Sequence, residues 1–357
     1  MKNLAQTADN WQKLVKPYAQ ADHKKSWWQF LSTLMGFALT WFLAYQSLRV
    51  SYWLTLLFCL FSTVFSVRLF IIFHDCGHGN YFKSKRLRTI IGYLCGILVL
   101  TPYWQWTKSH GIHHATSGNL DKRGIGDMLT YSIKEYEKLN WFHKLYYHCY
   151  RHPFMTFFLG PLMIFTIEYR FTAKIDGARE RKSVYLTNLA LLGILTLCYF
   201  TIGLKNFFLV QAPISIVACS VGSWLFYVQH QYAHPYWEKE ENWSFFDAAL
   251  KGSSYYKLPR ILQYASGNIG LHHLHHLSHA IPNYNLEKCM NDNELFQTPI
   301  TLTLKESFHC AFLNIYDEES QSLISFKEYR AQKKCQQKIR QQRGKELYTA
   351  QDFISDC

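Results

Sequence analysis

Four long apolar segments constrain this chain more than any other feature of its sequence. They cover residues 27–48, 51–73, 184–204 and 206–228. Since a bilayer core about 30 Å thick is crossed by roughly 20 apolar residues of helix, each segment has the length of a membrane span. Short turns separate the first segment from the second and the third from the fourth. The sequence therefore predicts an all-α integral membrane protein with four transmembrane helices in two hairpins.

Lysine and arginine residues flank these segments on one side. They are Lys24, Lys25, Lys83, Lys85, Arg86, Arg88, Arg179, Arg181 and Lys182. The two hairpin turns contribute only Arg49 and Lys205. Because basic flanks stay in the cytoplasm, we expect both termini and the long segment between the hairpins to be cytoplasmic. A signal-peptide core is missing from the N-terminus, so the first apolar segment is expected to remain as an anchor.

The composition and charge of the chain indicate which class of partner it has. The chain carries 38 Lys and Arg against 25 Asp and Glu, and 49% of its residues are hydrophobic. These values exclude a disordered or fibrous protein. Because the basic residues lie between apolar runs, they indicate a lipid bilayer as partner and no nucleic acid. The ten cysteines form no CxxC pair, which favours reduced and mostly structural thiols.

The remaining segments complete the expected organisation. Two shorter apolar stretches, 89–103 and 154–167, contain glycine and proline and read as half-inserted helices on the cytoplasmic leaflet. Arg68 is costly within a bilayer, so the second span is expected to leave the membrane after residue 67. The charged, Gln-rich end predicts a solvated helix or frayed tail, with docking to an acidic partner or anionic lipid as the sharper alternative.

The chain thus divides into three expected parts. An N-terminal cytoplasmic arm covers residues 1–26, a membrane domain covers 27–290, and a charged cytoplasmic tail covers 291–357.

Eleven of the 17 histidines fall in four short clusters on the cytoplasmic segments. The clusters are HDCGH at 74–78, HGIHH at 110–114, HQYAH at 230–234 and HHLHH at 272–276. Residues four apart lie on one face of a helix, so His74 and His78 can point at one object, as can His230 and His234. The two HxxHH clusters converge in the same way, and together the four clusters predict a cage of imidazoles.

Imidazole is a ligand that suits iron, zinc and copper. A structural zinc site takes four ligands, so eight or more histidines indicate a pair of metal ions. Cysteine pairs for iron–sulfur clusters and a haem attachment motif are missing from the sequence, which favours a dinuclear non-haem iron centre. A metal-transport or other non-enzymatic metal-binding protein is the alternative, but a transporter would place its ligands within the bilayer.

The words HDCGH, HGIHH and NIGLHHLHH, the last followed by IPNY, resemble the membrane fatty acid desaturases. The resemblance covers roughly residues 74–286 and is greatest to the omega-6 (Delta-12) branch with its bacterial relatives. It implies a bacterial inner membrane and, as iron ligands, the histidines of the three family boxes. These are His74, His78, His110, His113, His114, His272, His275 and His276.

The resemblance also implies roles for neighbouring residues. His234 matches an extra histidine after the last span, and His230 stands where some relatives carry an asparagine that reaches the metal through water. We include both as ligands. Asp75, Asn268 and His273 are expected to support the ligands without binding the metal. Histidines 23, 143, 148, 152, 279 and 309 are taken as ordinary surface or core residues.

The family chemistry implied is O2-dependent desaturation. Two electrons from a separate ferredoxin- or cytochrome b5-like carrier reduce a centre of two iron ions, two hydrogens leave neighbouring methylenes, and a cis double bond forms while oxygen becomes water. The substrate would be an acyl lipid or acyl thioester, with an 18-carbon monounsaturated chain favoured. No catalytic residue beyond the metal ligands is expected. A related carotenoid or alkane hydroxylase or ketolase is the enzymatic alternative.

Two further expectations concern the surroundings of the iron. Tyr103, Trp104 and Trp106 are either walls of a substrate tunnel or interfacial anchors. An acidic redox protein is expected to dock on the basic cytoplasmic face.

Overall fold

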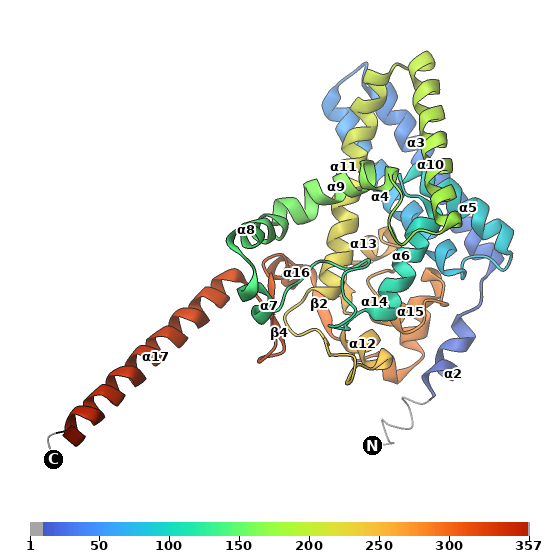
Figure 1. The fold of residues 1–357 in the computed structure, drawn as a ribbon. Coiled ribbons are helices and arrows are strands. Elements are labelled where there is room, and N and C mark those ends of the chain that lie inside the picture. Colours follow the sequence, from blue (N-terminus) through green and yellow to red (C-terminus); the bar gives the residue numbers. More distant parts are fainter. Residues whose placement is uncertain (1–9, 356–357) are drawn as a thin grey trace.

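The computed structural model describes residues 10–355, with side chains described to residue 342. Long helices gather at one end of the molecule, short helices form a body at the other, and one further long helix projects from this body (Figure 1). The long helices are α3 (His23–Ser47), α4 (Tyr52–His78), α10 (Ala178–Thr201), α11 (Leu204–His230) and α17 (Phe326–Ser355).

Helices α3 and α4 form a closely packed hairpin. The Asp22 carboxylate caps α3 by accepting hydrogen bonds from the backbone N–H groups of Lys24 and Lys25. A Cβ at Gly36 would lie 2.3 Å from the Phe65 ring, so any larger residue there would displace that ring. Helix α4 continues without a break to His78 and ends at Gly79 in the left-handed conformation that glycine adopts readily. The first histidine cluster therefore lies on the same helix as the second apolar segment.

Arg68 lies on α4 and is almost fully buried. Its guanidinium donates a hydrogen bond to the Thr33 hydroxyl and another to the backbone carbonyl of Tyr264, and it stacks over the Tyr264 ring. The charge of Arg68 is thus surrounded by neutral acceptors and an aromatic ring. From the sequence, Arg68 is expected to lie just beyond the part of α4 that crosses the membrane.

Helices α10 and α11 follow each other through a turn at Ile202 and Gly203, but they pack mainly against other helices, α10 against α6 (Tyr103–Thr116) and α11 against α4. Within the described residues, α4, α10 and α11 are long and apolar enough to cross a membrane. Helix α3 has the length but not the apolarity. Helices α5 (Lys85–Leu98) and α6 would supply a fourth span only as a pair, and the pair bends by 98°.

The segment between the hairpins is made of short helices. The apolar stretch 89–103 occupies most of α5 and the bend before α6, while 154–167 forms a π-helical turn and α9. Further elements here are α7 (Ile133–Lys138), α8 (Trp141–Tyr150), η2 (Met155–Leu159), α9 (Gly160–Thr166) and η3 (Glu168–Arg170). The first stretch is thus interrupted before α6, whereas the second is one helix that contains a π-helical turn.

The rest of the body comes from both ends of the chain. Strands β1 and β2 pair in parallel, and β3 and β4 pair antiparallel. The elements are α2 (Trp11–Val15), η1 (Lys16–Tyr18), α12 (Phe245–Lys251), β1 (Tyr255–Lys257), α13 (Arg260–Ala265), α14 (His272–Leu277), α15 (Asn283–Asn291), η4 (Glu294–Phe296), β2 (Thr301–Thr303), α16 (Leu304–Cys310), β3 (Ile315–Asp317) and β4 (Ser322–Ile324).

The packed body continues beyond residue 290, where the expected C-terminal tail begins. Phe296 is buried, and the Leu313 carbonyl accepts hydrogen bonds from Arg151 and Tyr227. The segment 291–325 therefore packs on the membrane domain, and the solvated helix that the sequence predicts is α17, which starts at residue 326.

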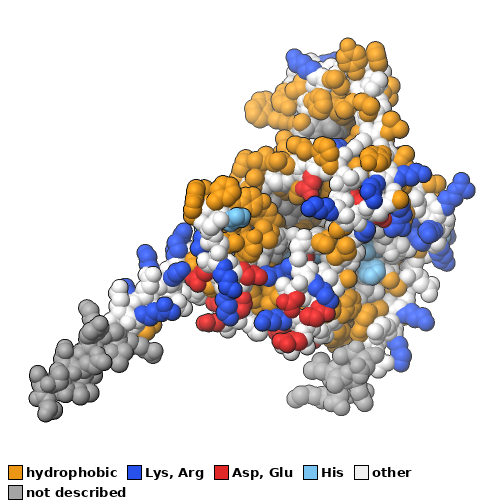
Figure 2. Space-filling view, viewed as in Figure 1, with side chains coloured by type: hydrophobic (Ala, Val, Ile, Leu, Met, Phe, Trp, Pro, Cys, Tyr) orange, Lys and Arg blue, Asp and Glu red, His pale blue; other side chains and the backbone are white. Residues whose placement is uncertain are grey.

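Apolar and charged side chains separate along the molecule. Hydrophobic side chains cover the end formed by the long helices, and charged side chains gather over the opposite end (Figure 2). Nine cysteines fall within the described residues, all are free thiols, and six of them are buried. This agrees with reduced cysteines that act mainly as small apolar residues.

Candidate metal centre and cavity

Nine histidines meet in two adjoining groups near the C-terminal ends of α4 and α11. The first group has five members, His74, His78, His110, His114 and His275. The second group has four members, His113, His230, His272 and His276. Within each group one ring nitrogen from every member lies within 4.8 Å of the others, as for ligands around a common ion. The groups adjoin, since the His114 and His276 rings stack with centroids 4.2 Å apart.

Helical spacing explains how the clusters are divided between the groups. On a helix of 3.6 residues per turn, positions i and i+4 share a face. Position i+3 is rotated from position i in the opposite direction to i+4, so its side chain can point to a different neighbour. Accordingly His110 and His114 join the first group while His113 joins the second. On α14, His272 and His276 join the second group while His275 joins the first. Each HxxHH cluster thus serves both groups.

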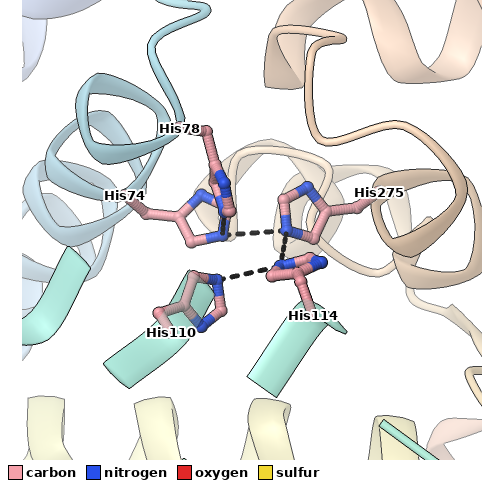
Figure 3. A group of neighbouring side chains, drawn as sticks. All are labelled: His74, His78, His110, His114 and His275. Atoms are coloured by element: carbon pink, nitrogen blue, oxygen red, sulfur yellow. Dashed lines mark hydrogen bonds between the residues drawn. The ribbon is translucent and has the colours of Figure 1, made fainter. Parts of the chain in front are cut away.

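Figure 3 shows the first group, with rings from α4, α6 and α14 turned toward one another. The Nε2 atom of His275 lies 3.0 Å from Nε2 of His74 and 3.0 Å from Nε2 of His114. His78 and His110 complete the group, with Nε2 atoms 3.3 Å from that of His74 and 3.1 Å from that of His114 respectively. The imidazole nitrogens therefore converge without a carboxylate among them.

The second group is fully buried. Nε2 of His230 lies 3.2 Å from Nε2 of His113 and 2.9 Å from Nε2 of His272. Nδ1 of His230 donates to the Gly252 carbonyl over 3.3 Å, which leaves its Nε2 without a proton in the neutral ring. Nε2 of His276 is buried and has no hydrogen-bond partner.

The electrostatics keep these rings in the form that binds metal. Burial, followed by the charges of neighbouring histidines, holds the pKa values of His272, His275 and His276 on α14 well below the usual 6.5. All three are therefore neutral at pH 7, and a neutral imidazole offers a lone pair to a cation.

Two carboxylates fix the orientation of ligand rings. Asp75 accepts from His74 Nδ1 at 2.9 Å and from the backbone and side-chain N–H groups of Asn283, both at 2.8 Å. Asp127 accepts from His113 Nδ1 at 2.5 Å. A carboxylate behind Nδ1 leaves Nε2 as the lone pair that faces the group.

Asp127 is positioned by a loop that passes close to α6. Gly126, the preceding residue, has φ +74°, and a Cβ there would lie 3.0 Å from both His113 Cβ and the Ser109 carbonyl. Glycine at 126 therefore permits the approach that brings Asp127 to His113.

A pair of metal ions fits this donor set. Several Nε2 lone pairs lie about 3 Å apart, as in the contacts from His275 to His74 and His114. His74 donates its proton from Nδ1 to Asp75, so in neutral rings at most one of the two contacts at His275 Nε2 can contain a proton, and the nitrogens of the other repel one another unless a cation lies between them. Two adjoining groups of neutral imidazoles thus offer donors for a metal centre.

The structure does not bring together every residue singled out from the sequence. The expectation that His230 and His234 share a helical face is wrong, because α11 ends at His230 and His234 is exposed beyond it, outside both groups. Asn268 contacts the Asn283 carbonyl at 3.4 Å and no histidine. His273 is buried on the far side of α14, outside both groups, where burial lowers its pKa to about 4.

Sequence reasoning also missed two residues. Asp127 carried no signal of its role, because its contact with His113 depends on how the loop after α6 folds. His279, taken as an ordinary histidine, has its ring centroid 5.0 Å from that of His78.

A cavity of about 540 Å³ extends from the long helices to the histidines. Its walls come mainly from α4, α6, α9 and α11, and most of the lining is apolar. His74, His110 and His272 line its inner end, so the cavity reaches both groups. Of the three aromatic residues for which a wall and an anchor were both considered, Trp106 is part of the cavity wall. Tyr103 and Trp104 are not, since the Tyr103 hydroxyl bonds the Cys76 carbonyl and Trp104 lies under Arg179.

The sequence pattern described as "Fatty acid desaturase" matches residues 51–297. The chain belongs to the fatty acid desaturase family. A protein named "Fatty acid desaturase" from Bacillus subtilis (strain 168) is 47% identical over 315 residues, 88% of this chain and 90% of that protein. Members of this family are oxidoreductases, so the desaturase reading from the sequence is confirmed.

More distant relatives carry more specific names. A Synechocystis protein named "sn-1 acyl-lipid omega-3 desaturase (ferredoxin)" is 28% identical over 62% of this chain and 62% of its own length. A Crepis alpina protein named "Delta(12) fatty acid dehydrogenase" is 27% identical over 69% of this chain and 71% of its own length. The desaturase thus resembles relatives named for two different double-bond positions.

Replacing Asp127 by asparagine is expected to weaken metal binding about tenfold or more, because the amide cannot hold the His113 imidazole as a carboxylate does. The measurement is the metal retained per chain after dialysis against graded chelator. Asp121→Asn is the matched control, since Asp121 lies in the same loop but accepts from the backbone of Glu240. Equal retention in both variants would contradict the role given to Asp127.

Proposed function

We propose that this desaturase inserts a cis double bond into the acyl chain of a membrane lipid, using two iron ions held by the nine grouped histidines. One observation carries the proposal: a single cavity joins apolar helices of membrane-spanning length to both histidine groups. A hydrocarbon chain is the ligand that such a lining favours, because methylene groups and apolar walls pack together without needing hydrogen bonds.

The cavity walls position the chain by packing alone. Val67, Phe70 and Ile71 of α4 line the cavity together with Gly222 and Phe226 of α11. Close-packed aromatic and aliphatic walls restrict a flexible chain to few conformations, so one methylene pair is held beside the histidines. Methylenes along a chain are chemically almost identical, and this restriction is what selects among them.

Packing and hydrogen bonds restrain the ligand rings of the metal site. Trp106 stacks on His110 with ring centroids 4.3 Å apart and packs against Phe73, so an aromatic wall shields that ligand. Asp75 and Asp127 hold the rings of His74 and His113 from behind. When bound, the two iron ions supply O2 activation and removal of two hydrogen atoms from neighbouring methylenes.

For the position of the bond we propose the omega-6 (Delta-12) type on an 18-carbon monounsaturated chain. The motif words of the sequence and the Crepis alpina relative named "Delta(12) fatty acid dehydrogenase" support this choice. The acyl carrier favoured is a membrane lipid, because the cavity is formed by the membrane-spanning helices.

The test is fatty-acid methyl ester profiling by gas chromatography with mass spectrometry, on cells that express the chain. We expect a new diunsaturated 18-carbon ester, whose fragmentation places the second double bond six carbons from the methyl end. A new bond elsewhere would refute the position alone. A hydroxylated product, or an unchanged profile in cells that supply a reduced carrier, would refute desaturation.

We further propose that four helices cross a bacterial inner membrane, with α3 as the fourth span, and that the histidines and both termini are cytoplasmic. The basic flanks support this orientation. Exposed apolar side chains on short helices fit contact with the cytoplasmic leaflet, among them Trp141 on α8, Ile261 on α13 and Phe308 on α16.

Cysteine labelling tests this topology. In a chain lacking the exposed Cys149, a membrane-impermeant maleimide applied to intact spheroplasts should leave Cys335 on α17 unlabelled. After Cys335 is replaced as well, Arg49→Cys in the α3–α4 turn should become labelled from outside. The reverse pattern would overturn the orientation.

The electron donor is proposed to be a separate, acidic, ferredoxin- or cytochrome b5-like carrier. The Synechocystis relative whose name includes "ferredoxin" supports the iron–sulfur choice. The net charge of +13 favours an acidic partner.

A further inference from the structure

The two histidine groups differ in how close they lie to the protein surface. All four members of the second group are buried, whereas His78 and His110 of the first are half-buried. His110 lines the cavity, but His78 does not. The edge of the first group at His78 is therefore the part of the metal centre that approaches the surface away from the cavity.

His279 stands at this edge. It follows α14 and is exposed, and its ring centroid lies 5.0 Å from that of His78 and 5.6 Å from that of His114. Its backbone carbonyl accepts a hydrogen bond from the Asn80 side chain at 2.6 Å, which ties it to the end of α4. His279 belongs to neither histidine group, so it links the surface to two ligands without being one of them.

We propose that His279 is the electron entry point of this desaturase and the centre of the docking surface for an acidic one-electron carrier. This inference rests on the proposed function and names the residues that serve its donor. Electron tunnelling weakens steeply with distance, so a π-system packed between the surface and two ligand rings provides the favoured route.

The electron balance is simple. Each encounter would oxidise the carrier by one electron, which the metal pair would take up through the first group. Two encounters deliver two electrons. With two protons from water and two hydrogens from the acyl chain, they reduce one O2 to two water molecules.

Positive charge lies on the segment that adjoins the proposed entry point. Lys83, Lys85 and Arg86 are exposed in the segment that follows α4. The Arg88 guanidinium passes beside Gly79, where a Cβ would lie 3.7 Å from Arg88 Nη2, and Gly79 adjoins both His78 and Asn80. Lysine and arginine side chains gather over α5 in Figure 2. An acidic carrier is the partner that this charge attracts and orients.

The experiment follows electron entry without acyl substrate or O2. A reduced plant-type [2Fe–2S] ferredoxin is mixed anaerobically with the iron-loaded, full-length protein, and ferredoxin oxidation is followed by stopped-flow absorbance. We expect His279→Ala to slow this oxidation about tenfold or more while the iron content stays unchanged. Reduction by dithionite, a small reagent that needs no docking surface, should proceed as in the parent protein.

Matched variants separate this role from a structural one. His309→Ala removes another exposed histidine, on α16, and should leave the rate unchanged. The double variant Lys83→Glu, Lys85→Glu should raise the Kd for ferredoxin about tenfold and flatten its salt dependence. Lys305→Glu on α16 should do neither.

Three results would overturn the inference: unchanged ferredoxin oxidation by His279→Ala, loss of iron from that variant, or no oxidation of ferredoxin by the parent protein. Failure of the proposed function looks different, since normal electron uptake would then accompany an unchanged fatty-acid profile.

Discussion

Replacing His113 by alanine is expected to abolish double-bond formation, with a loss of at least about 100-fold in product. His113 is one of only four members of the second group, and its Nε2 lies 3.2 Å from that of His230. The variant removes one ligand from a fully buried site, where water replaces it poorly. The ion of that group should therefore be lost, while the five histidines of the first group retain theirs.

The measurement combines iron per chain, by elemental analysis of purified protein, with the fatty-acid profile of the same cells. His143→Ala is the control, because His143 is exposed on α8 and bonds only to Asn140. Membrane fractionation should recover both variants equally, since His113 contributes to the site and not to a membrane-spanning segment. Full activity or full iron content in His113→Ala would refute the assignment of the second group.

Much of this histidine centre was predictable because helical periodicity places its residues. His74 and His78, four apart on α4, enter one group because helical periodicity alone places them on one face. The same rule pairs His110 with His114 and His272 with His276. Nine of the ten histidines proposed as ligands therefore fall in the two groups.

The tenth histidine, His234, shows where helical periodicity no longer predicts the site. His234 shares a face with His230 only if the helix continues, and α11 stops at His230. The chain then turns away, and no residue in the cluster itself marks that end.

Contacts between segments far apart in the chain could not be predicted from the sequence. Asp127 reaches His113 through a loop whose path depends on Gly126, and Asp75 is held by Asn283, 208 positions away. The apolar helices were predictable as elements, but the cavity between them was not, because it depends on which of their faces meet. The charged composition of the C-terminal segment likewise concealed Phe296 and Leu313, which pack into the body.

The cavity offers a test of function that leaves the metal site intact. Gly222 lies on α11 and lines the cavity, and a Cβ placed there would meet nothing within 4 Å. A large side chain at this position therefore projects into free space without displacing the packed core. It would occupy the route that the acyl chain is proposed to take.

Gly222→Trp is expected to remove double-bond formation almost completely while iron content and ferredoxin oxidation remain those of the parent protein. An indole that fills part of a cavity of about 540 Å³ excludes a chain that has to pass it to reach the histidines. Gly193→Trp is the matched control: Gly193 is an exposed helical glycine on α10, also with nothing within 4 Å of its Cβ position, and it does not line the cavity. Fatty-acid profiles of cells with equal amounts of each variant decide the matter. Parent-like desaturation by Gly222→Trp would show that the acyl chain takes another route, whereas equal loss in both variants would point to a general cost of tryptophan in these helices.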